Sequence, residues 1–192
     1  MDATDLPSAG VFAWKRRMGV HEAYHRSAVN RALHWAFIPL ELWAVLKLLS
    51  CVALGPLGDA ALVAVVLVAP IYLLTEPVIG TLMVLLLVAG RGLALHFMAS
   101  APGWGALIAG GVFAAAFAAQ VRIGHGVFEA GRDDTDKNLT ELRRTGNPVP
   151  ILLVFYYHLV EIALAAGYRP RLASDIRRFT EVEAAALGEH VG

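Results

Sequence analysis

Charged residues and cysteine are both scarce in the middle of this 192-residue chain. Between residues 32 and 128 only six side chains carry a formal charge, although both flanks are rich in charge. A helix on the surface of a soluble domain needs a polar face, and this stretch lacks the residues to form one. The composition therefore excludes an ordinary soluble domain and predicts an integral membrane protein.

The charge balance and the cysteine count exclude further classes of protein. The formal net charge is zero and no basic stripe is present, so we expect no nucleic-acid partner. Cys51 is the single cysteine, so it cannot form an intrachain disulfide, and we interpret it as a small core residue. Because Met1 to Val20 contains no apolar run, we also expect no cleavable signal peptide.

Four apolar segments approach the length of about 20 residues that a membrane-crossing helix needs. They are residues 32–57, 60–75, 77–99 and 103–127, and Gly90-Arg91-Gly92 predicts a break in the third. We therefore expect an all-α fold, a polytopic helical bundle in a single domain over residues 1–192. Its four transmembrane helices would lie within residues 32–127.

The flanks complete the predicted bundle. Residues 1–31 are expected to contain a cytoplasmic N-terminal helix, and residues 129–148 a polar loop. Residues 149–168 predict a fifth apolar helix, re-entrant or packed against the bundle, because a further crossing would export the arginines that follow it. Residues 172–192 form a polar tail with an amphipathic helix, for which Ser174 is a suitable N-terminal cap.

Basic residues set the expected orientation. Five lysines and arginines precede the first apolar segment, and the turn after it has none, so the N-terminus is expected in the cytoplasm. The alanine-, arginine- and glycine-rich composition favours a bacterial inner membrane over the endoplasmic reticulum.

Histidine is the residue type that points to chemistry. Ionisable groups at membrane depth are costly and mark functional sites. Six of the seven histidines lie in or beside the apolar segments, and so many in one small bundle predict a metal site; they are His21, His25, His34, His96, His125 and His158.

The spacing of these residues supports a metal site. His21 and His25 are four residues apart, as two ligands of one ion on a helix face would be. His158 and Glu161 are three apart, the reverse of the Glu-x-x-His pairing in di-iron bundles. Imidazole and carboxylate donors without thiolate favour non-haem iron.

Two longer stretches resemble a known family. Tyr24–Pro39 contains His-x4-Asn-x3-His-x4-Pro, and Gln120–Glu129 reads Gln-x2-Ile-Gly-His-Gly-Val-Phe-Glu. With Asn138-Leu139 and Gly167–Pro170, their order over residues 20–172 is similar to that of the membrane 2-hydroxy fatty acid dioxygenases, a family long described as a domain of unknown function.

The resemblance implies an Fe(II)-dependent enzyme that uses O2 to cleave the C1–C2 bond of 2-hydroxy fatty acids in lipid α-oxidation. The matched histidines His25, His34 and His125 would be the iron ligands. Asn30 would orient them, and Glu129 is a second candidate catalytic residue. The resemblance carries nothing to His21, where relatives often have an aromatic residue. His21, His158 and Glu161 therefore remain candidate metal ligands on spacing alone.

The chain departs from the family after Glu129. Residues 130–135 replace the usual Lys-Arg-x-Pro-Ala-Leu, and Lys137 stands where an aspartate is usual. A substrate head group is expected to enter a polar mouth formed by residues 20–34 and 122–148, with the acyl tail among the helices or in membrane lipid.

Two other functions stay open at this point. A lipid or terpenoid isomerase or cyclase would use His25, Glu129 or Glu161 as acids and bases and would resist chelators. A non-enzymatic lipid- or metal-binding membrane protein, or a small transporter, would show no oxygen consumption.

Overall fold

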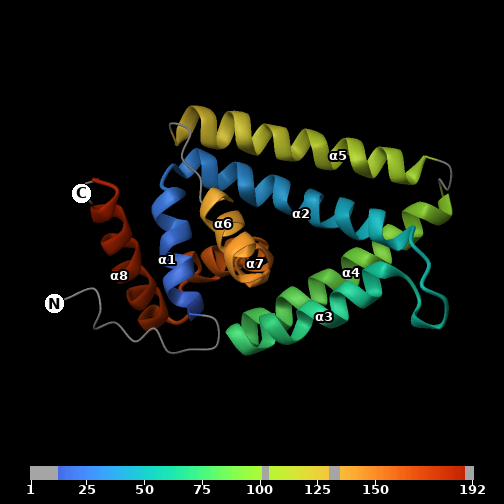
Figure 1. Cartoon of the computed structure of the whole chain (residues 1–192), viewed down its shortest axis with the longest axis horizontal. Coiled ribbons are helices and arrows are strands. Elements are labelled where there is room, and N and C mark those ends of the chain that lie inside the picture. Colours follow the sequence, from blue (N-terminus) through green and yellow to red (C-terminus); the bar gives the residue numbers. More distant parts are fainter. Residues whose placement is uncertain (1–12, 101–103, 130–134, 189–192) are drawn as a thin grey trace.

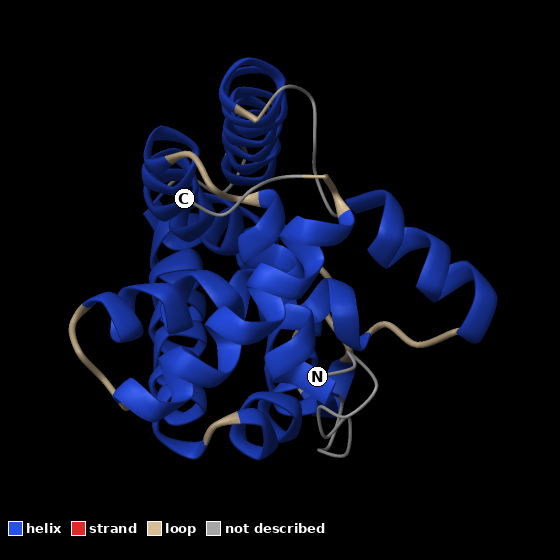
Figure 2. Cartoon of the chain, turned by 90° about the vertical axis from the view of Figure 1, so that its left-hand side faces the viewer, coloured by secondary structure: helices blue, strands red, loops and turns tan. Residues whose placement is uncertain are grey.

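Helices joined by short turns make up the computed structural model, which describes residues 13–100, 104–129 and 135–188; these ranges contain no strand (Figure 2). The all-α prediction is confirmed. The helices are α1 (Trp14–Tyr24), α2 (Ala28–Ser50), the short η3 (Gly55–Leu57), α3 (Ala60–Thr75), α4 (Pro77–Ser100), α5 (Gly105–Ala119), η4 (Gln120–Phe128), α6 (Thr135–Thr145), α7 (Val149–Ala165) and α8 (Pro170–Ala186).

Three segments of the described chain are long and apolar enough to cross a membrane: Ala28–Ser50, Pro77–Phe97 and Gly105–Phe128. We expected four. The remaining predicted span, α3, has 16 residues, which at 1.5 Å per residue extend about 24 Å, less than a hydrocarbon core of about 30 Å.

The long helices form two antiparallel pairs. α2 lies along α5 and η4, and α3 lies along α4 (Figure 1). α1 packs on α8, at the left of Figure 1. α7, seen end-on in Figure 1, contacts α1, α2, α3, α4 and α6 and is therefore the central element of the fold.

Large apolar side chains are exposed along α3, α4 and α5. Leu67, Leu85 and Leu107 are 68%, 60% and 68% exposed, and many neighbours on these helices are similar. An apolar surface of this extent is unfavourable in water and is matched by lipid acyl chains. The exposed apolar side chains and the three helices long enough to cross a membrane thus both favour a lipid environment.

Two predicted boundaries are wrong. The polar loop predicted over residues 129–148 contains α6, a short amphipathic helix that ends at Thr145, just before Gly146, whose φ is +70°; residues 130–134 lie outside the described residues. α8 begins at Pro170, so Ser174 lies inside the helix and is not its cap. Proline at the first helical position already has the φ that the helix needs.

The break predicted at Gly90-Arg91-Gly92 is also wrong, because α4 continues through it. Arg91 instead reaches the start of α3, where its Nε lies 3.1 Å from Asp59 Oδ1 and its Nη2 forms an ion pair with Oδ2. The side chain of Lys47, in the last turn of α2, is fully buried.

Candidate metal centre

His25 lies in the break between α1 and α2. α1 ends at Tyr24, and the His25 N–H donates to the carbonyls of His21 and Glu22. α2 begins three residues later, at Ala28, and its N-cap Ser27 accepts with its hydroxyl from the backbone N–H of Asn30 at 3.3 Å. The break between the two helices leaves His25 in the interior, only 3% exposed.

Six candidate ligands from the sequence form two buried groups. In each group, one potential ligand atom per residue lies within 4.8 Å of the others. The groups are His25, His34 and His125, and His21, His158 and Glu161. His96 is exposed and belongs to neither group, and His190 lies outside the described residues.

The two groups touch each other. The rings of His21 and His25 stack with centroids 3.9 Å apart, and those of His34 and His158 are 5.0 Å apart. The sequence spacing correctly placed His21 beside His25. The expectation that these two residues share one ion is not supported, because they fall in different groups.

Backbone carbonyls orient two of the imidazoles. His25 Nδ1 lies 2.8 Å from the carbonyl of His21, and His34 Nδ1 lies 2.9 Å from the carbonyl of Asn30. Because a carbonyl only accepts, we assign the proton of each ring to Nδ1, which leaves the Nε2 lone pair for a metal. Burial, together with the neighbouring His21 and His34, lowers the pKa of His25 well below its usual value, so this imidazole is neutral.

The second group contains a carboxylate with one unsatisfied oxygen. Glu161 Oε2 lies 3.1 Å from His158 Nδ1 and accepts from Trp35 Nε1 at 3.2 Å. Glu161 Oε1 is buried and has no hydrogen-bond partner among the described residues. A buried carboxylate oxygen is unfavourable without a donor or a cation, so this atom fits a metal ligand.

Trp35 is the residue that sequence analysis missed at this site. Its indole N–H donates to Glu161 Oε2 and so holds the carboxylate in place. The two residues are 126 positions apart, and only the docking of α7 against α2 brings them together. No sequence spacing signals such a contact.

Asn30 and Glu129 lie beside the first group rather than in it. Glu129 Oε1 accepts from the backbone N–H of Ser27 at 2.6 Å and lies 3.4 Å from Asn30 Nδ2. Glu129 thus ties the end of η4 to the start of α2. Asn30 Oδ1 is buried, has no hydrogen-bond partner among the described residues, and faces Gly124.

His125 is carried by a π-helical segment. α5 changes at Gln120 into η4, whose wider turns continue to Phe128. Gly124 and Gly126 flank His125 within these turns. π-helical turns are rare and are frequent at functional sites, because they place a side chain that a regular helix would turn away.

A cavity of about 310 Å³ lies next to the second group. Its lining includes the basic residues Arg16, Arg17 and Lys137, and Tyr157, whose ring centroid is 5.3 Å from that of His21. Its walls come from α1, α6, α7 and α8. Val20, Lys137, Asn138 and Glu141 of this lining fall within residues 20–34 and 122–148, where we predicted a mouth for a substrate head group, and that role stays a prediction.

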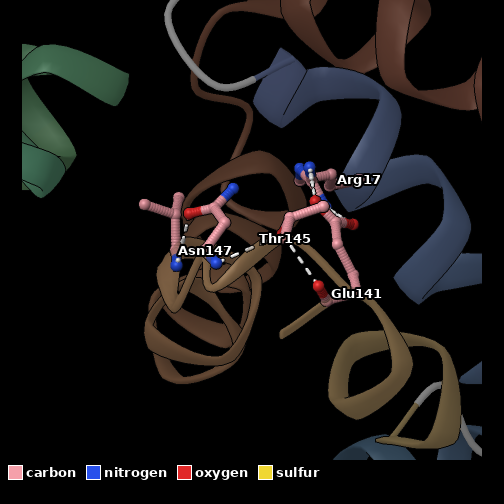
Figure 3. Close-up of polar contacts among 5 residues, drawn as sticks. Arg17, Glu141, Thr145 and Asn147 are labelled. Carbon is pink, nitrogen blue, oxygen red and sulfur yellow. Dashed lines mark hydrogen bonds and ion pairs between the residues drawn. The ribbon is translucent and has the colours of Figure 1, made fainter. Parts of the chain in front are cut away.

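Polar contacts fix α6, which forms one side of this cavity, to α1 and α7 (Figure 3). Arg17 on α1 donates two hydrogen bonds to Glu141, of 2.7 and 2.6 Å. The Thr145 hydroxyl donates to the carbonyl of Glu141 and accepts from the Asn147 N–H, and Asn147 Oδ1 accepts from the first N–H of α7. These bonds link α1, α6 and α7 in series.

Comparisons with known proteins return no family model, no curated protein and no solved structure that matches this chain. What the site can do is therefore argued from its own residues. They offer two buried sets of nitrogen and oxygen donors, which could hold metal ions.

Proposed function

We propose that this protein is a membrane-embedded, Fe(II)-dependent dioxygenase that shortens 2-hydroxy fatty acids by one carbon. One observation carries the proposal: residues from α1, α2, η4 and α7 converge in two buried groups of metal-ligating atoms. Imidazole and carboxylate donors without thiolate suit non-haem iron. Three protein ligands leave positions open for a substrate and O2.

Fe(II), when bound, supplies the redox chemistry with O2 that side chains lack. The protein's own residues would hold the metal ion and orient its ligands. His25 and His34 present Nε2 because carbonyls hold their Nδ1 atoms, and such support of the second ring nitrogen is what metal-bound imidazoles need. Glu129 fixes the start of α2 and with it the position of Asn30.

The cavity beside the second group supports an acidic substrate. Its lining has three basic residues and two acidic ones. Glu141 pairs with Arg17 and Glu183 pairs with Lys137, so the excess positive charge that attracts a carboxylate comes from Arg16. The apolar helices offer a complementary surface to an acyl chain. A 2-hydroxy fatty acid combines both features, and its hydroxyl and carboxylate oxygens lie next to the C1–C2 bond that would break.

The proposal includes a membrane location. Segments Ala28–Ser50, Pro77–Phe97 and Gly105–Phe128 would cross, with α3 as a shorter fourth helix. The basic residues before α2 favour a cytoplasmic N-terminus, in a bacterial inner membrane.

Oxygen uptake by detergent-purified, iron-loaded protein tests this proposal. We expect uptake with 2-hydroxyhexadecanoate, formation of the acid one carbon shorter, and no uptake with hexadecanoate. His125→Ala should abolish the reaction, whereas His96→Ala, a matched change at an exposed histidine, should retain it. Iron-loaded wild type that consumes no oxygen with any 2-hydroxy acid would refute the assignment.

A further inference from the structure

We infer that the protein binds two metal ions side by side, one in each histidine group, and that His21, His158 and Glu161 form the second site. This inference deepens the proposed function and rests on it for the identity of the metal. The two sites would be separate in ligands but adjacent in space, as in binuclear centres, where the ions lie about 3.5–4 Å apart.

The number of ligands argues against a single ion. His25, His34 and His125 already supply the three protein ligands of an open metal site. If the second group bound the same ion, six protein ligands would saturate it and leave no position for a substrate. Two groups of three instead provide two open sites.

The dimensions of each group fit one ion. With ligand bonds of about 2.1 Å in a tetrahedral site, two ligand atoms are about 3.4 Å apart. The ligand atoms of each group already lie within 4.8 Å of one another. Side-chain movements of about 1 Å therefore close either group around its own ion.

The two groups are in contact through two pairs of histidine rings. The stacked rings of His21 and His25, at 3.9 Å, join one side, and His34 and His158, at 5.0 Å, join the other. His21 is on the last turn of α1 and His25 directly follows the helix, so this short stretch would supply one ligand to each ion.

Glu161 gives the second site its negative charge. His158 and Trp35 both contact Oε2 and so fix the carboxylate, while the buried Oε1 has no hydrogen-bond partner among the described residues. A carboxylate that had only to orient His158 would need one oxygen. The second oxygen is accounted for by a cation held between Glu161 and the two histidines.

Metal content of the full-length protein in detergent tests the inference. After loading with excess Fe(II), and separately Co(II), and removal of free metal, elemental analysis should give two ions per chain for wild type and for His96→Ala. Glu161→Gln keeps the size and shape of the side chain, and it should reduce the value to one. His158→Ala should do the same.

Electron paramagnetic resonance of Mn(II)-loaded protein provides a second readout that does not depend on activity. Two Mn(II) ions a few ångströms apart couple magnetically, so wild type should give a broadened spectrum and Glu161→Gln the spectrum of an isolated ion. One ion per chain in wild type, or two in Glu161→Gln, overturns the binuclear site. Two coupled ions without oxygen uptake would uphold it and refute only the proposed reaction.

Discussion

Gly124 lies directly against the side chain of Asn30: a Cβ at position 124 would be 2.2 Å from Asn30 Oδ1. No heavy atom tolerates such a distance, so η4 and α2 approach this closely only because residue 124 has no side chain. The contact sets the spacing between His34 on α2 and His125 on η4. The metal centre thus depends on a glycine that is not itself a ligand.

Gly124→Ala should therefore weaken metal binding. The added methyl group pushes Asn30 and α2 away from η4 and separates ligands of the first group, and we expect affinity to fall by about 10- to 100-fold, as for other losses of ligand support. Metal titration followed by elemental analysis measures the change. Gly111→Ala, where nothing lies within 4 Å of the new Cβ, is the control; equal affinities in both variants would contradict the argument.

Glu129→Ala should release the start of α2. The change removes the acceptor of the Ser27 N–H and the neighbour of the Asn30 amide, so His25 and His34 lose their common support. We expect a fall in metal affinity of about tenfold with the helical content preserved. Glu181→Ala, on the exposed side of α8, should bind metal like wild type.

Chelation should lower the thermal stability of wild type. An ion that binds only the folded state stabilises it by about 2.7 kcal/mol when its concentration is 100 times Kd. The Tm of metal-loaded protein in detergent is expected to fall on addition of chelator and to recover with Fe(II). A His25→Ala/His158→Ala double variant should show no such response, and a wild-type Tm indifferent to chelator would argue against bound metal.

The Arg17–Glu141 pair predicts a pH dependence of stability. The hydrogen bonds from Arg17 lower the pKa of Glu141 below its ordinary value. A carboxyl with a lowered folded-state pKa stabilises the protein above its unfolded pKa, and that stabilisation disappears as the pH falls through the folded-state pKa. Both side chains are about a quarter exposed, so we expect about 0.5–1 kcal/mol.

Glu141→Gln measures this contribution. Its free energy of unfolding should be lower than that of wild type at pH 7. The difference should shrink as the pH falls below the ordinary glutamate pKa of about 4.3 and vanish only below the lowered folded-state pKa of Glu141. Lys15→Met, which removes a more exposed ion pair between α1 and α8, is the comparison. A difference that persists unchanged in acid would mean that the substitution acts through packing.

Local patterns predicted much of this protein, and long-range docking explains what they missed. Hydropathy located the apolar helices because it is a property of each segment alone. The spacing of His158 and Glu161 placed them in one group because three residues are nearly one helical turn. The assignment of His21 and His25 to different groups depends instead on where α7 docks, because α7 carries His158 and Glu161. The Trp35–Glu161 contact depends on the same docking. The polar segment over α6 was misassigned because two leucines are too short a pattern to predict a helix.

The π-helical segment also restricts how the length of this chain can vary through evolution. If the wide turns relaxed into a regular α-helix with no change in residue count, each residue after Gln120 would rotate further about the axis, by the roughly 100° of an α-helix. His125 would then point away from α2, toward lipid or solvent. Homologous chains that keep the histidine groups should therefore place their insertions and deletions in the connecting loops and preserve the residue count from Gln120 to His125.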